Sequence, residues 1–243
     1  SDGAAARPEA ARPLSSAAAS ASARRTMPLA SSVMVPLIAK MRWQAATEAT
    51  HKAIRLNRFI AYKSINAFFQ GVWGTAYVGL MTPLAPEIFS AGGIGFSIGT
   101  SVVALAYSRL FNLKWFFRIS ITVEVVALIS VIAILLYPPG FALAAGIYLG
   151  FQVALIFGSY LVRFETLLIA KDQLKIVDIG KSVGALLGLA FAAAFYQWAR
   201  HSLGTDDPPT LVQAIHYPLL AVQALNVAVL LSAFNRRHFS ASV

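Results

Sequence analysis

Two long apolar runs meet at a proline pair in residues 121–162, which read ITVEVVALISVIAILLYPPGFALAAGIYLGFQVALIFGSYLV. Each run is long enough to cross the ~30 Å hydrocarbon core of a bilayer as an α-helix. Pro138, Pro139 and Gly140 lie between the runs and favour a tight turn. This stretch therefore predicts a helical hairpin inside a membrane.

The composition of the whole chain agrees with a membrane protein. Hydrophobic residues occupy 58% of the 243 positions and charged residues 12%, whereas soluble domains are about half apolar and about a quarter charged. A soluble domain of this length needs more polar side chains to cover its surface. The chain contains no cysteine, which excludes disulfides, thiolate zinc sites and cysteine-ligated iron–sulfur clusters.

Apolar runs on both sides of the hairpin raise the number of predicted spans to about six. Each has roughly 18–23 residues, the length needed to cross the hydrocarbon core. The predicted spans are residues 64–86, 88–108, 116–137, 141–162, 182–199 and 217–234. We therefore predict an all-α fold, a polytopic transmembrane bundle that occupies residues 64–237.

The placement of basic residues predicts the orientation of this bundle. With six spans, every one of the 20 Lys and Arg residues except Arg200 falls on the side of the N-terminus. Because Lys and Arg accumulate on the side that is not translocated, both termini are expected on this basic side, in the cytoplasm, matrix or stroma. The net charge of +10 is explained by topology, so the expected partner is the lipid bilayer and not a nucleic acid.

The segments outside the bundle have compositions of their own. Residues 1–35 are rich in Ala, Ser, Pro and Arg, which is typical of a disordered or extended tail and resembles an organellar transit peptide. A plain basic tail is the alternative. Residues 36–63 repeat apolar side chains at helical spacing among basic ones, which predicts an amphipathic helix on the membrane surface. Residues 238–243 form a short C-terminal tail.

Small residues recur at every fourth position in the fourth and fifth predicted spans. In lipid, such stripes let two helix backbones approach closely. The glycines expected to form these contacts are Gly146, Gly150 and Gly158 in one span, and Gly180, Gly184 and Gly188 at and within the next. We therefore predict that the fourth and fifth spans pack against each other.

Glu124 is the only formal charge well inside a predicted span. An ionised carboxylate is costly in the hydrocarbon core, so such a residue is a candidate for function. The alternative is a structural ion pair with a basic neighbour near the interface. The candidate basic neighbours for this ion pair are Lys114, Arg118 and Arg163.

Uncharged polar side chains in the spans extend this hypothesis. Gln223 and Asn226 are three residues apart and therefore share one face of a helix. The candidates to line a proton, ion or polar-solute path with Glu124 are Gln70, Gln152, Gln223 and Asn226. The alternative role for these side chains is hydrogen bonding between helices, worth about 1 kcal/mol each.

No pattern in the chain predicts an enzyme, a metal site or a cofactor, although bound lipids are expected. The four histidines, His51, His201, His216 and His238, fall at or outside the ends of the predicted spans. Haem ligation in a bundle needs histidines that face each other within it. A rhomboid-like protease needs a histidine inside a helix as well.

The layout resembles one six-helix half of a major facilitator superfamily transporter. The resemblance rests on the basic loop SRLFNLK at residues 108–114 and on residues 160–188, with Arg163, Glu165, Lys171 and Lys175 before the glycines. Members of that family bind substrate between two halves, so the resemblance implies that this chain pairs with itself or with another subunit.

Two functions remain open from the sequence. One is a non-catalytic membrane subunit of a larger organellar complex, in the mitochondrial inner membrane rather than a plastid, which the transit-like tail favours. The alternative is a small-solute or proton-coupled transporter that acts as a homo- or heterodimer of six-helix halves. A bacterial inner membrane is the other location that the charge distribution allows.

Overall fold

A computed structural model of the protein describes residues 54–137 and 140–234. These residues all belong to one compact unit. The predictions for residues 1–35, 36–53 and 238–243 lie outside the described residues.

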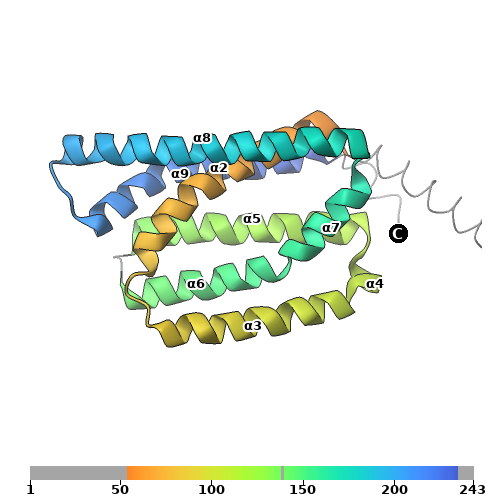
Figure 1. Ribbon diagram of the computed structural model, residues 1–243, viewed down its shortest axis with the longest axis horizontal. Helices are drawn as coiled ribbons and strands as arrows, with labels where there is room; N and C mark the ends of the chain where they lie inside the picture. Colours follow the sequence, from red (N-terminus) through yellow and green to blue (C-terminus); the bar gives the residue numbers. More distant parts are fainter. Residues whose placement is uncertain (1–53, 138–139, 235–243) are drawn as a thin grey trace, which may run out of the picture. The chain divides into compact units, whose positions relative to one another are not determined.

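The described chain is helical, as predicted, and forms an all-α polytopic bundle without a β-strand in its described ranges. Its helices are α2 (Leu56–Met81), α3 (Pro86–Leu105), α4 (Tyr107–Leu110), α5 (Leu113–Leu136), α6 (Phe141–Ile156), α7 (Gly158–Leu168), α8 (Lys171–Leu203) and α9 (Pro208–Ala233). The turns after α2 and α8 lie at one end of the bundle, and those after α4 and α7 lie at the other (Figure 1).

Five helical segments are long and apolar enough to cross a membrane. They are Pro86–Leu105, Leu113–Leu136, Phe141–Leu168, Asp172–Leu203 and Pro208–Ala233. The first predicted span, now part of α2, is not among them. Asn66 and Gln70, together with its Gly, Ser, Thr, Trp and Tyr residues, lower its hydropathy. Six spans therefore remains a prediction, with α2 as the sixth helix.

The predicted boundary between a surface helix and the first span is wrong. No break occurs at residues 63 and 64, because α2 begins at Leu56 and runs without interruption to Met81. Phe59 in its first turn is fully buried and packs against Phe116 and Phe234, with ring centroids 6.4 Å away in each case. This aromatic contact joins the start of α2 to the bundle.

The fifth predicted span lies inside a longer helix, and the sixth corresponds to the C-terminal part of one. α8 continues from Lys171 to Leu203 and ends at Gly204, whose φ of 61° is the left-handed conformation that glycine adopts without strain. α9 begins at Pro208 because Asp207 caps it, accepting a hydrogen bond from the Thr210 backbone N–H at 3.1 Å.

The fourth predicted span is a broken helix. α6 ends at Ile156, Phe157 interrupts the regular pattern, and α7 begins at Gly158. Gly158 and Ser159 follow the break directly, and Gly/Ser pairs are a common cause of helix kinks. Figure 1 shows that α7 leaves the direction of α6 and leads to the start of α8.

The predicted contact between the fourth and fifth spans is wrong, because the glycine stripe of α8 packs on α2. A Cβ atom at Gly184 or Gly188 would overlap a backbone carbonyl oxygen of α2, and one at Gly180 would lie 2.6 Å from the Ser64 hydroxyl. By contrast, a Cβ at Gly146 or Gly158 meets no atom within 4 Å, and one at Gly150 meets only Val126, at 3.9 Å. The closest backbone approach in this part of the chain is therefore between α2 and α8.

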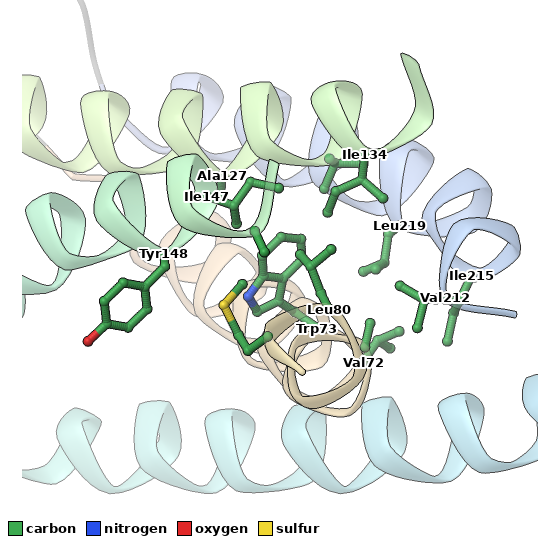
Figure 2. Close-up of a cluster of buried hydrophobic side chains, with 14 of the residues drawn as sticks. Val72, Trp73, Leu80, Ala127, Ile134, Ile147, Tyr148, Val212, Ile215 and Leu219 are labelled. Carbon is green, nitrogen blue, oxygen red and sulfur yellow. The ribbon is translucent and has the colours of Figure 1, made fainter. Parts of the chain in front are cut away.

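An apolar core surrounds the middle of α2. Trp73 of α2 stacks on Phe151 of α6, with ring centroids 5.1 Å apart. Figure 2 shows Val72, Trp73 and Leu80 of α2 in one cluster with Ile134 of α5, Ile147 of α6 and Leu219 of α9. α2 contacts α8, α9 and α6, so this helix connects the parts of the bundle.

Candidate functional site

Glu124 lies in the middle of α5 and is only 2% exposed. Two side chains of α2 donate hydrogen bonds to its Oε1 atom, the Tyr62 hydroxyl at 2.7 Å and the Asn66 amide at 2.5 Å. Two side chains of α9 donate to Oε2, the Gln223 amide at 2.9 Å and the Asn226 amide at 2.8 Å. The carboxylate therefore joins three helices, and we call this group the Glu124 hub.

Neutral donors take the place of a counter-ion in the Glu124 hub. A carboxylate has about four acceptor positions, and the four donors fill them. Hydrogen bonds to an ionised acceptor are stronger than those between neutral groups, which offsets part of the cost of burying the charge. Among the described residues Glu124 forms no ion pair, so the alternative of a salt bridge to Lys114, Arg118 or Arg163 is wrong.

The structure brings together four of the five predicted polar residues. Gln223 and Asn226 lie on the same face of α9 and are fully buried against Glu124. Gln70 extends the group by donating to the Asn66 side-chain oxygen at 2.6 Å. Gln152 stands apart, because it makes no hydrogen bond with the residues that the structure describes.

A second buried carboxylate, Glu165 of α7, was not predicted as a site residue. It is 1% exposed and pairs with Lys63 of α2 at 2.6 Å and Lys181 of α8 at 2.8 Å. Asp178 lies 3.6 Å from Lys181, but its side chain is 64% exposed. We call Lys63, Glu165 and Lys181 the ion cluster.

A cavity of about 390 Å³ lies between α2, α5 and the broken helix formed by α6 and α7. Its polar side chains come from α2 and α5, whereas α6 and α7 contribute apolar residues. The polar side chains are Tyr62, Lys63, Asn66, Gln70 and Glu124, and the apolar ones include Phe69, Trp73, Phe151, Leu155 and Val162. The Glu124 hub and the ion cluster thus both contribute to one cavity.

His216 corrects the prediction that every histidine lies at or beyond a span end. It lies inside α9 and is fully buried, where its Nδ1 atom is 2.5 Å from the Val212 carbonyl oxygen. Its ring meets Trp73 edge-on, with centroids 5.5 Å apart. No second histidine faces it in the described ranges, and those ranges contain no group of three His, Cys, Asp or Glu residues that could hold a metal ion.

Neither a protein-family model, nor a curated protein, nor a solved structure matches this chain. The geometry of the site is therefore the basis for a functional proposal.

Proposed function

We propose that this protein is a membrane transporter that binds a small polar solute in the cavity beside Glu124. The observation that carries the proposal is the cavity itself. Its wall places Lys63, Asn66 and Gln70 next to Glu124, within a helical bundle that spans a membrane. Charged and amide groups are costly at this depth, and a cavity that admits water or a polar solute gives them a partner.

The broken helix supports the same proposal. In many transporters, substrate sites are formed near the middle of the bilayer by discontinuous helices. Here the break at Phe157 adjoins the cavity, because Ala154 and Leu155 before it and Gly158 after it all line the wall. A short segment such as α7 is also a suitable element for changing access to a site.

The proposal includes a partner and a location. As one six-helix half, the chain would act as a homo- or heterodimer, as the family resemblance implies. The predicted orientation places its basic end in the mitochondrial matrix, the plastid stroma or the bacterial cytoplasm. The corresponding location is an organellar or bacterial inner membrane.

Cysteine labelling tests whether the cavity is open to water. Because the chain has no cysteine, single cysteines can be introduced and compared in reconstituted protein. Gln70→Cys places one in the cavity. Ile98→Cys is the matched control on α3, at a residue that is 62% exposed. A membrane-impermeant thiosulfonate needs a thiolate, which forms in water and not in lipid. We expect Gln70→Cys to react and Ile98→Cys to resist, and equal resistance at both sites would overturn the proposal.

A flux measurement tests transport directly. Uptake into proteoliposomes under a pH gradient, compared between wild type and Glu124→Gln, separates proton-coupled transport from other roles. We expect the variant to lose gradient-driven uptake while remaining folded. Absence of gradient-driven uptake by the wild type for every tested solute would remove proton coupling from the proposal.

The second candidate function is a non-catalytic subunit of a larger organellar membrane complex. The observation that favours it is the complete occupation of the Glu124 carboxylate by Tyr62, Asn66, Gln223 and Asn226, because such a hub also serves simply to join helices. This candidate predicts that the protein, extracted in mild detergent, migrates in a large assembly. Migration as a monomer or dimer favours the transporter.

A further inference from the structure

The cavity has a surplus of hydrogen-bond donors at the position of Lys63. Glu124 lines the same wall, but its four acceptor positions are occupied. The Lys63 ammonium carries three donors, and within the described ranges its one acceptor is Glu165. A solute that reaches this wall therefore meets an ammonium group with N–H donors still available and a carboxylate whose acceptor positions are already filled.

The charges of the ion cluster point in the same direction. Glu165 is shared between Lys63 and Lys181, and Asp178 lies 3.6 Å from Lys181, so the carboxylate that pairs with Lys63 also serves a second ammonium group. The Lys63 side chain is 15% exposed and belongs to the cavity wall, whereas Lys181 does not line the cavity. Lys63 is therefore the cationic side chain that the described cavity wall offers to a ligand.

The rest of the cavity offers an apolar surface. Trp73 is 4% exposed and lines the cavity, and its indole Nε1 is itself buried, so a ligand meets the ring and not this donor. Phe151, Leu155 and Val162 complete the apolar wall.

We propose that the cavity selects small organic anions, with the carboxylate of the ligand on Lys63 and its apolar part against Trp73 and Phe151. This inference rests on the proposed function and adds the substrate class. Lys63 is the residue that determines the class. Glu165 acts through Lys63, because it competes with the ligand for the same ammonium group.

Fluorescence quenching of Trp73 tests the proposal on the full chain in nanodiscs. Trp43, Trp115 and Trp198 are replaced by Phe, which leaves Trp73 as the single tryptophan. The probes are 4-bromobenzoate, 4-bromobenzyl alcohol and 4-bromobenzylammonium, which share one bromophenyl quencher and differ in charge. We expect saturable quenching by the carboxylate at concentrations where the other two probes give only weak, linear quenching.

Two substitutions with opposite expected signs test the role of Lys63. Lys63→Met removes a charged donor and should raise the half-saturation concentration of 4-bromobenzoate by about tenfold or more. Glu165→Gln frees Lys63 and should lower that concentration. Lys114→Met is the control, because it removes one positive charge from the same end of the bundle at a residue outside the cavity wall.

The outcomes separate this inference from the proposed function. The anion class is overturned if only the alcohol probe or only the ammonium probe quenches saturably. It is also overturned if Lys63→Met leaves the half-saturation concentration of 4-bromobenzoate unchanged. In both cases the proposal of a solute-binding cavity stands without a substrate class. Equal weakening by Lys63→Met and Glu165→Gln also overturns the anion class, because a purely structural ion pair predicts that result. If no probe quenches saturably, the anion class is overturned, and labelling of Gln70→Cys decides separately whether the cavity function stands.

Discussion

Glu124 and Glu165 are both buried carboxylates in one bundle, yet they are stabilised in opposite ways. Glu124 is 2% exposed and Glu165 is 1% exposed. Neutral side chains of α2 and α9 surround Glu124, whereas two lysines of α2 and α8 hold Glu165. The same chemical group is thus balanced by hydrogen bonds in one place and by opposite charge in the other.

The exposure of the partners differs in the same way. Lys63 and Lys181 keep 15% and 32% of their side chains exposed, so these lysines stay partly solvated. Tyr62, Gln223 and Asn226 around Glu124 are buried, and a lysine in their place would lose its water. Burying a neutral amide or hydroxyl costs less than burying a second charge. A carboxylate enclosed by buried side chains is therefore better served by fixed neutral donors.

The largest expected effect is that of Glu124→Leu, which removes the carboxylate that accepts from four donors, although Gln223 keeps its bond to the backbone carbonyl of residue 124. Because each unsatisfied buried group costs about 1–3 kcal/mol and some donors will find other partners, we expect a loss of roughly 3 kcal/mol or more in the free energy of unfolding. Titration with a denaturing detergent in mixed micelles measures it. Glu124→Gln keeps an acceptor and should lose less, and equal stability of both variants with wild type would refute the role of the hub.

Glu165→Gln should have a smaller effect, about 1–2 kcal/mol, because the released lysines can turn toward water. The same detergent titration compares it with Glu124→Leu. A loss as large as that of Glu124→Leu would contradict the explanation by the exposure of the partners.

Tyr62→Phe removes one of the four donors and should cost about 1 kcal/mol. Tyr77→Phe is a matched control on the same helix, because Tyr77 makes no hydrogen bond with a described residue, and it should leave the free energy of unfolding nearly unchanged. Equal losses in the two variants would assign the effect of Tyr62 to ring packing rather than to its hydroxyl.

The smallest expected effect is the response to salt. Raising the ionic strength from about 0.05 M to about 0.5 M should reduce the cost of Glu165→Gln by a few tenths of a kcal/mol, because partly exposed ion pairs are screened. The cost of Glu124→Leu should stay constant over this range. If salt changes the cost of Glu124→Leu and leaves the cost of Glu165→Gln unchanged, the proposed difference between the two carboxylates is contradicted.

Part of the site could be predicted because its signals are local. The length of an apolar run is enough to predict a membrane helix, and a polar residue in such a run stands out, as Glu124, Gln223 and Asn226 did. Gln152 lies in a helix that is apolar on every side, so no pattern shows which face meets the hub. Glu165 was missed because it follows the predicted fourth span, where no apolar run marks it as buried, although it lies in α7.

The partner of a small-residue stripe is not a local property. The spacing of Gly180, Gly184 and Gly188 correctly marks a close backbone approach without saying which helix comes close. Adjacency in the chain favours the fourth and fifth spans as a pair, but α8 packs on α2, roughly 100 residues earlier. The spacing of small residues along the chain shows that a helix makes a close contact. Which helix it contacts depends on how the whole bundle is arranged.

The central position of α2 also has a consequence for how the protein is made. α2 is the first of these helices to leave the ribosome, and it is the long helix that falls below the hydropathy typical of a span. Its partners α8 and α9 are the last to be synthesised, with roughly 150 residues between Met81 and Ala233. At ~5–20 residues per second, translation separates them by about 8–30 s. Asn66 gains Glu124 with α5 and Lys63 gains Glu165 with α7, but the face of α2 that carries Gly71 lacks its partner until α8 arrives. We therefore expect the first helix to be held by the insertion machinery until its last neighbours have been made.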